Sequence, residues 1–338
     1  MKTLVMGNEA VACGALKAGM SFFAAYPITP ASEIMHVLAD YEPAIAFVHA
    51  EDEIASIHMA IGASLAGRKA MTSTSGPGMS LKQEGIGLAH MMEVPLVVVN
   101  VQRVGPSTGM PTLAAQGDIL QAAHGSHGDY VPLVFYPSSV EECYRITIEA
   151  FNAAEESRSP VTLLLDGYLA HLLETVDLDA IEVALKPRTL EPLGRGRRHF
   201  TGLLAKDGVP KTKDSAYYRE WYARVKAKIL GTAAQYRFFD YQKTAGAETL
   251  LVAFGITARV LQPLTRDYSL FKPISLFPIL ENELRAAADE HKSVVVVEMN
   301  DGQYRGEIQK VLRREVRGIS LLGGRISLNE IRERLGGL

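Results

Sequence analysis

Short apolar runs that alternate with helical stretches are the feature that most constrains how this chain can fold. The runs Pro95–Val101, Pro160–Asp166 and 293–300 are almost continuously apolar, and segments of helical composition separate such runs along the sequence. A strand that is apolar on both faces is buried on both faces, as in a parallel sheet covered by helices. We therefore predict an α/β fold built on parallel sheets.

The alternation is interrupted once, and the interruption predicts two α/β domains joined by a connecting segment. We predict a first domain over residues 1–175, a linker or excursion over 176–242, and a second domain over 243–338. Residues 186–215 carry a basic cluster among glycines and prolines, which favours a solvated connector and leaves contact with an acidic partner as an alternative. A helix is expected over Ala216–Leu230.

The composition excludes several classes of protein. The chain has 338 residues, of which 47% are hydrophobic and 22% charged, and its net charge of −3 does not indicate binding to nucleic acid or to an anionic membrane. No apolar run reaches the roughly 18–20 residues that span a bilayer, and the N-terminus lacks a leader segment, so a cytoplasmic protein is expected.

Two cysteines, Cys13 and Cys143, cannot hold a four-cysteine iron–sulfur cluster. The histidines show no metal-ligand spacing, and no metal site is predicted on this chain.

The carboxyl ends of the predicted strands carry the most unusual stretches of the sequence. Ligands of open parallel sheets bind in the loops that follow these ends. In chain order the ends are YPITP (26–30), HAEDE (49–53), STSGPGMS (73–80) and QRVGPSTGMPT (102–112). Because they share one edge of the sheet, we expect them to form the candidate site.

The helix after HAEDE is rich in alanine, serine and glycine and extends to Gly67. Small side chains let its backbone approach a neighbour closely, so we predict a buried helix with Glu53 at or just inside its first turn. Acids in a first turn commonly cap free N–H groups and complement the helix dipole. On local sequence alone, Glu51, Asp52 and Glu53 could all serve as such caps, and a chemical role for Glu53 stays open.

Two other strand ends contain groups that can bind anions. Thr29 precedes Pro30, and proline is favoured at the first helical position, so Thr29 is predicted to be a helix N-cap at an anion-binding helix start. Arg103 follows a strand, within an expected loop over Arg103–Thr112, and can pair with a carboxylate. The segment 75–80, SGPGMS, lacks the spacing of a phosphate loop and is a weak anion-site signal or a tight turn before a helix near Leu81.

An ordered set of these stretches resembles the α subunit of 2-oxoacid:ferredoxin oxidoreductases, nearest the 2-oxoglutarate or 2-oxoisovalerate branch. The similar stretches, which cover nearly the whole chain apart from residues 186–240, are GNEAVACGALKAGMSFFAAYPITPASEI, EDEIASIHMAIGASLAG, MTSTSGPGMSLKQEGIGLA, EVPLVVVNVQRVGPSTGMPT and VEMNDGQYRGEI. Any one stretch alone would be weak, whereas the ordered set is specific. The resemblance implies a thiamine-diphosphate pyrimidine-binding domain followed by a transketolase C-terminal-like domain.

The resemblance also implies roles for individual residues. Glu53 matches the glutamate that hydrogen-bonds N1′ of the aminopyrimidine, and Glu51 and Asp52 do not match that position. An acid in a close-packed, water-poor site can hold a proton there. Thr29 and Arg103 match groups that contact the substrate carboxylate. We further expect substrate contacts from Ser107 and Thr108, and cofactor contacts from Tyr26, Pro27, Ser75 and Gly76.

The same resemblance implies partners that complete the active site. A 2-oxoacid would lose CO2, coenzyme A would take the acyl group, and electrons would pass to iron–sulfur clusters. A β subunit is expected to carry the pyrophosphate-binding domain, Mg²⁺ and a [4Fe–4S] cluster, with a γ or ferredoxin-like subunit and ferredoxin or another acceptor as further partners. The alternatives are a pyrimidine-domain subunit of another thiamine enzyme, such as an E1 β chain or a split transketolase, and a non-catalytic α/β scaffold.

Overall fold

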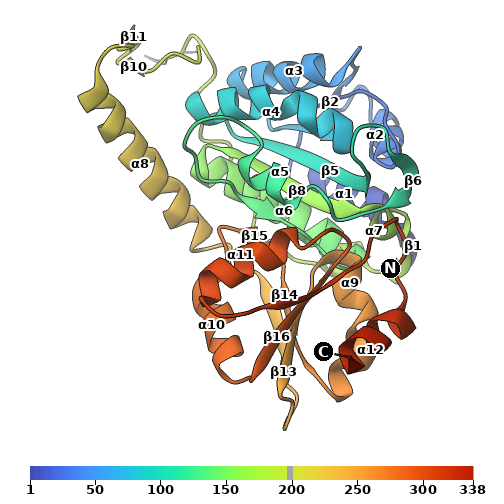
Figure 1. The fold of residues 1–338 in the computed structure, drawn as a ribbon. Coiled ribbons are helices and arrows are strands. Elements are labelled where there is room, and N and C mark those ends of the chain that lie inside the picture. The colour runs from blue at the N-terminus through green and yellow to red at the C-terminus, as the bar shows by residue number, and fades with distance from the viewer. Residues whose placement is uncertain (196–200, 338) are drawn as a thin grey trace.

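The computed structural model describes residues 1–195 and 201–337, which form two α/β domains stacked on each other (Figure 1). The first sheet has the strand order β15-β7-β8-β5-β4-β2-β3, with β6 beside β5. Its strands are β2 (Phe22–Ala25), β3 (Ala46–His49), β4 (Ala70–Thr74), β5 (Leu96–Val104), β6 (Met110–Ala114), β7 (Val134–Phe135), β8 (Pro160–Asp166) and β15 (Ser275–Phe277). All are parallel to their neighbours except β6 and β15, so the predicted α/β class is confirmed.

Helices cover both faces of the first sheet. One face packs against α1 (Gly7–Lys17), α2 (Ser32–Ala39) and α6 (Val140–Ser157), and the other against α3 (Glu53–Leu65) and α4 (Gly76–Met91). Side chains alternate along a strand. In β5, Val97 and Val99 therefore belong to the apolar core under α1, α2 and α6, whereas Leu96 and Val98 belong to the core under α3 and α4. The short helices α5 (Ile119–His124) and α7 (Gly167–His171) lie at the edge that faces the second domain.

The second domain has a five-stranded sheet of order β12-β14-β13-β16-β17. Its strands are β12 (Phe239–Gln242), β13 (Thr249–Val252), β14 (Ser269–Pro273), β16 (Ser293–Glu298) and β17 (Arg317–Ser320). Its helices are α9 (Gly255–Val260), a 3₁₀ helix (Gln262–Arg266), α10 (Glu281–Asp289), α11 (Gln303–Leu312) and α12 (Leu328–Gly336). Every pairing is parallel except that of the edge strand β12, which begins before residue 243.

Two segments depart from a simple alternating sheet. The strand β1 (Thr3–Met6) pairs antiparallel with β9 (Leu173–Val176) in a separate two-stranded sheet. The other is the stretch after β14, where the chain leaves the second sheet at Pro273 and joins the first sheet as β15. Strand β15 therefore connects the second domain to the first sheet, and one apolar core is continuous between the two domains.

The connecting segment contains the predicted helix, observed as α8 (Ser215–Ala233), which projects along the left of Figure 1. A 3₁₀ turn (Leu178–Ala180) and a small hairpin of β10 (Ala205–Lys206) and β11 (Val209–Pro210) precede it. Val225 and Ile229 of α8 are buried in the core of the first domain. The cluster residues Arg195, Lys206, Lys211 and Lys213 are exposed as expected, whereas Arg197 and Arg198 lie outside the described residues.

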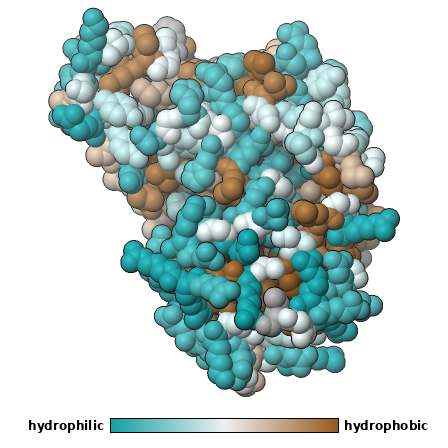
Figure 2. Space-filling model, in the orientation of Figure 1, coloured by the Kyte–Doolittle hydropathy of each residue, from teal (hydrophilic) through white to brown (hydrophobic). Residues whose placement is uncertain are grey.

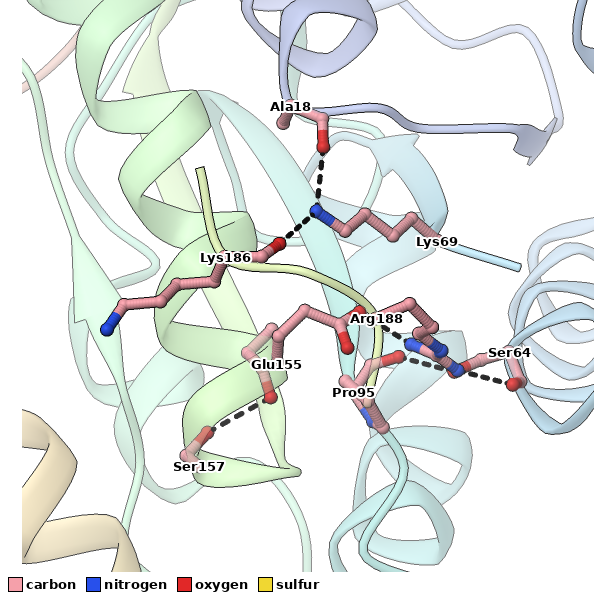
Figure 3. A network of polar contacts seen from close by, with 9 residues as sticks. Ala18, Ser64, Lys69, Pro95, Glu155, Ser157, Lys186 and Arg188 are labelled. Carbon is pink, nitrogen blue, oxygen red and sulfur yellow. Dashed lines mark hydrogen bonds and ion pairs between the residues drawn. The ribbon is translucent and has the colours of Figure 1, made fainter. Parts of the chain in front are cut away.

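The start of this segment is fastened to the first domain by buried polar groups (Figure 3). Lys69 donates hydrogen bonds to the carbonyl oxygens of Ala18 and Lys186, at 2.8 and 2.7 Å. Arg188 donates to Glu155 Oε1 at 2.6 Å and to Ser64 Oγ at 2.7 Å. Burial lowers the pKa of Lys69, against the charge of Glu155, which raises it. The connector is therefore not solvated throughout, and the domain limits remain a prediction.

No helix among the described residues is long and apolar enough to cross a bilayer.

Candidate active site

Glu53 is the first residue of α3 and lies just beyond the carboxyl end of β3. Its side chain is buried, with 6% of its surface exposed. The preceding residue, Asp52, is the N-cap and accepts a hydrogen bond from the N–H of Ala55 at 2.6 Å. Glu51 is exposed, and no described residue donates a hydrogen bond to the Glu53 carboxylate. Capping is thus done by Asp52, and the Glu53 carboxylate is left available for a ligand.

A glycine in the neighbouring helix leaves room for this carboxylate. The helix α4 begins at Gly76 with Ser75 as N-cap, so residues 76–80 are already helical and the expected start near Leu81 is wrong. Proline in the first turn suits a helix start, which explains why the Gly-Pro-Gly sequence is helical. A Cβ on Gly78 would lie 2.5 Å from Glu53 Oε1 and would also collide with the Thr74 hydroxyl. The carboxylate therefore occupies a space between two helix N-termini, which favour negative charge.

Arg103 lies in β5 rather than in a loop. The strand continues to Val104 and forms a hairpin with β6, which corrects the expected loop over Arg103–Thr112. The tight turn depends on Gly109, whose φ is +51° and whose Cβ would collide with the Val104 carbonyl. Arg103 Nη1 donates to the backbone carbonyl of Thr29 at 2.8 Å. Burial lowers the pKa of Arg103, while the charges of Asp118 and Glu53 raise it, so the guanidinium lies within electrostatic reach of both acids.

Thr29 is brought beside Arg103 but is not a helix cap. The helix α2 begins at Ser32 with Ala31 as its N-cap, and the Thr29–Pro30 bond is cis. The N–H of Ala31 donates to the carbonyl of Ile28 at 2.8 Å, so residues 28–31 form a separate turn before the helix. The Thr29 side chain is exposed, and it is the Thr29 carbonyl that contacts Arg103.

A cleft of about 460 Å³ lies where this edge faces the second domain. Three predicted residues line it, namely Gly76, Arg103 and Ser107. Its other polar lining residues, which the sequence did not single out, include Ser80, Gln121, Asp118, Asn300, Asp301 and Gln303. Burial raises the pKa of Asp118, against a hydrogen bond from Asn100 at 2.9 Å and the charge of Arg103. The second domain thus supplies one wall of the candidate site.

Several buried polar atoms at this edge have no partner among the described residues. They are Ser75 Oγ, Asn100 Oδ1 and Arg103 Nε. Leaving a buried polar atom unpaired costs about 1–3 kcal/mol, so such atoms are normally bonded. Three of them at the ends of adjacent strands, beside the free carboxylate of Glu53, fit a site that is completed by a polar ligand.

Three other predicted residues, Thr108, Tyr26 and Pro27, are not among the residues that line the cleft. Thr108 is exposed and does not line the cleft, and the same holds for Tyr26, which is 40% exposed. Pro27 is half-buried in the turn after β2. Their contacts with substrate or cofactor therefore remain predictions. Gly78 and the buried Lys82 were not predicted at all, since nothing in local sequence distinguishes a glycine or a lysine that faces a buried acid.

The sequence matches the family described as pyruvate flavodoxin/ferredoxin oxidoreductase, thiamine diP-binding, over residues 13–239. The chain belongs to this family. It is 42% identical to the 2-oxoglutarate synthase subunit KorA of Archaeoglobus fulgidus, over 96% of this chain and 95% of the relative. It is 36% identical to the ketoisovalerate oxidoreductase subunit VorB of Methanothermobacter thermautotrophicus, over 98% and 96% of the two chains. These relatives place it among the α-type subunits of 2-oxoacid:ferredoxin oxidoreductases, in the 2-oxoglutarate and ketoisovalerate branch.

Solved structures agree with this assignment. The chain is similar to a 2-oxoglutarate:ferredoxin oxidoreductase from Magnetococcus marinus with 2-oxoglutarate, coenzyme A and succinyl-CoA bound, with a TM-score of 0.92 and 31% identity. The match covers 99% of this chain and 65% of that longer chain. A split-gene transketolase, at 15% identity and a TM-score of 0.57, shares the fold alone. The predicted family, enzyme class and thiamine-enzyme architecture are therefore confirmed.

Proposed function

We propose that this chain supplies half of a thiamine-diphosphate site that oxidatively decarboxylates a 2-oxoacid, with Glu53 as the residue that holds a proton at N1′ of the aminopyrimidine. One observation carries the proposal: Glu53 is a buried acid whose carboxylate receives no hydrogen bond from a described residue. A carboxylate that no described residue engages, at the sheet edge where ligands of parallel sheets bind, fits a ligand-binding role.

The residues at this edge fit the cofactor. Gly78 keeps the space beside Glu53 Oε1 open, and the unpaired Ser75 Oγ and Asn100 Oδ1 can hydrogen-bond a polar ring system. When bound, thiamine diphosphate supplies the carbon nucleophile that attacks the 2-oxo carbon. Glu53 holds the proton at N1′, and the close packing of α3 against α4 keeps water away from that proton.

Arg103 is suited to orient the 2-oxoacid. Its Nη1 is fixed by the Thr29 carbonyl, whereas its Nε has no partner and can donate to a carboxylate. Ser107 lines the same cleft, and Thr108 is next to it in the turn. The relatives are named for 2-oxoglutarate and ketoisovalerate, so we propose that a 2-oxoacid of one of these kinds is the substrate, with coenzyme A as the acyl acceptor.

The other half of the site comes from a partner. The relatives are named as subunits, and large apolar side chains are exposed near the site edge at Ile54, Leu81, Met110 and Leu322. Figure 2 shows apolar patches over the first domain, while hydrophilic side chains predominate over the second. We propose a β subunit with a pyrophosphate-binding domain, Mg²⁺ and a [4Fe–4S] cluster. We also propose a γ or ferredoxin-like subunit and a ferredoxin-type electron acceptor. We propose that the complex is cytoplasmic.

The proposal is tested on the native complex, purified with its partner subunits. Dye reduction by a viologen is measured with a panel of 2-oxoacids, with and without coenzyme A. We expect coenzyme-A-dependent reduction with 2-oxoglutarate or a branched 2-oxoacid. Glu53→Gln should lower turnover about 1000-fold, a magnitude typical of losing an acid–base group, whereas the exposed Glu51→Gln should stay within about twofold. Reduction independent of coenzyme A, or normal turnover in Glu53→Gln, would contradict the proposal.

A further inference from the structure

Lys82, in the second turn of α4, is a charged residue with 0% of its surface exposed. Its ammonium donates to the backbone carbonyl of Glu53 at 3.1 Å, to the Thr72 hydroxyl at 3.1 Å, and to the Ser56 hydroxyl at a shorter distance. Thr72 belongs to β4, and Glu53 and Ser56 belong to α3. One buried cation therefore joins the first turn of α3 to β4 and α4, with an acceptor for each of its three N–H groups.

Packing alone does not explain a lysine at this position. Burying an unpaired charge is costly, and a cation is also unfavourable at the positive N-terminus of α3. Burial lowers the pKa of Lys82 to about 7, against the charges of Glu53 and Asp52, which raise it. A methionine of similar length would fill the same space without the cost of removing a charge from water. The interactions of the ammonium, rather than its volume, must therefore account for it.

The bonds converge on the peptide group of Glu53 itself. Ser56 Oγ donates to the Glu53 carbonyl at 3.0 Å, so this oxygen accepts two side-chain hydrogen bonds, and Ser56 Oγ in turn accepts one from Lys82. The carboxylate of the same residue receives none from a described residue. The backbone of Glu53 is held firmly while its carboxylate is left free, which is the arrangement needed to aim an acid at a ligand.

We propose that Lys82 is a positioning residue for Glu53: its buried ammonium fixes the first turn of α3 and places a positive charge near the Glu53 carboxylate, which holds that carboxylate in the space beside Gly78. This role rests on the proposed function of Glu53. Lys82 is fully buried and is not among the residues that line the cleft, so it acts through the acid that it orients.

The test replaces the cation by an apolar side chain of similar length, Lys82→Met, in the assembled complex. In the cofactor-free complex, amide hydrogen exchange over residues 53–57 should become at least about tenfold faster, which corresponds to about 1.4 kcal/mol of lost local protection. With thiamine diphosphate bound, exchange of the cofactor's C2 proton should slow at least about 30-fold, while the KM for the 2-oxoacid stays within about twofold.

A matched control is available in Lys69, which is also buried and donates to the backbone carbonyls of Ala18 and Lys186. Lys69→Met removes the buried ammonium of the network in Figure 3, whose hydrogen bonds go to Ala18 and Lys186 rather than to α3. It should lower the melting temperature and leave both C2 exchange and amide protection at residues 53–57 unchanged. If the two methionine variants lose stability equally and neither changes C2 exchange, Lys82 is structural and the inference is overturned.

Two further variants keep the outcome decisive. Ser56→Ala removes one acceptor and leaves the lysine, so it should change C2 exchange in the same direction by a smaller factor, and it substitutes for Lys82→Met if that variant fails to assemble. Glu53→Gln is measured in parallel. Wild-type C2 exchange in Glu53→Gln would defeat the proposed function, whereas loss in Glu53→Gln with wild-type behaviour in Lys82→Met and Ser56→Ala would defeat only the inference about Lys82.

Discussion

Two buried acids, Glu53 and Asp166, lie at strand-to-helix junctions of the same sheet and are used in opposite ways. Asp166 ends β8 and is the N-cap of α7. Its carboxylate accepts hydrogen bonds from the N–H of Leu169 at 2.8 Å and from Tyr136 Oη and the N–H of Ile256 at 3.0 Å each. The Glu53 carboxylate accepts none from a described residue. The saturated acid joins the two domains, and the unsaturated acid is free to bind a ligand.

The glycines that face the two acids show the same difference. A Cβ on Gly255, whose φ is +57°, would lie 2.7 Å from Asp166 Oδ2, because the backbone of the second domain approaches this acid directly. A Cβ on Gly78 would lie 2.5 Å from Glu53 Oε1, yet the carboxylate that occupies this space receives no hydrogen bond from a described backbone N–H. The glycine allows a domain contact at one acid, and at the other it makes room for a carboxylate that is left unbonded.

The largest effect is expected from Gly78→Ala, which places a methyl group where the Glu53 carboxylate lies. The new methyl group would displace the Glu53 carboxylate, so turnover should fall about 1000-fold, or about 4 kcal/mol, together with affinity for thiamine diphosphate. Calorimetric titration of the cofactor into the complex measures this loss. Gly62→Ala is the matched control, because a Cβ on this α3 glycine meets nothing within 4 Å and should leave binding intact. Normal cofactor affinity in Gly78→Ala would break the distinction between the two acids.

The next effect concerns the cation that accompanies the free acid. Arg103→Ala removes the donor proposed for the substrate carboxylate and should raise the KM for the 2-oxoacid about 50-fold, as expected for a charge-assisted hydrogen bond of roughly 2 kcal/mol. Arg103→Lys should recover part of that loss. Steady-state kinetics with saturating coenzyme A decide the matter, and an unchanged KM in Arg103→Ala would place the substrate carboxylate elsewhere.

The saturated acid should behave as a structural group. Burial raises the pKa of Asp166, while its hydrogen bonds oppose that rise. Asp166→Asn replaces an acceptor oxygen by an amide donor, which leaves an N–H such as that of Ile256 unpaired and should cost about 2 kcal/mol of unfolding free energy. Urea unfolding measures the loss. Turnover per folded complex should stay near normal, and a loss of turnover without a loss of stability would contradict this role.

A third acid, Glu93, offers the smallest effect and a dependence on pH. Burial raises its pKa, but a hydrogen bond from Arg224 and the charge of Lys228 outweigh this and lower it to about 2. Since the folded value lies below the ordinary 4.5, the ionised group stabilises the fold above about pH 4.5, and the contribution is lost as pH falls toward 2. Glu93→Gln should therefore cost about 1 kcal/mol at pH 7 in urea unfolding. A difference from the wild type that does not shrink below pH 4.5 would show that the ion pairs with α8 are not its source.

The sequence allowed the sheet and its reactive edge to be predicted because buried parallel strands have a distinctive composition. The strands β5, β8 and β16 follow from their continuous apolar runs, and the predicted burial of Glu53 in the first turn of its helix is confirmed. Of the acids that the sequence left open as caps, the structure shows Asp52 in that role. The catalytic role of Glu53 remains a prediction. Its position at the edge followed from the rule that loops after parallel strands meet there.

Other features depended on tertiary contacts that local sequence does not encode. Thr29 was predicted as a cap from Pro30, but the turn over residues 28–31 delays the helix to Ser32. Arg103 was placed in a loop because glycines and prolines follow it, whereas a tight hairpin extends the strand. Lys82 could not be recognised, since a lysine on a helix is normally solvated and only the approach of α3 and β4 buries it.

The most direct test of the central claim is the exchange of the C2 proton of bound thiamine diphosphate, measured by NMR in the assembled complex. Wild type, Glu53→Gln and Asp166→Asn are compared at saturating cofactor, so that binding and subunit assembly are controlled. We predict that exchange slows at least about 100-fold in Glu53→Gln and stays within about twofold of wild type in Asp166→Asn. Unchanged exchange in Glu53→Gln would show that the free carboxylate does not hold the proton at N1′, and the account would be contradicted.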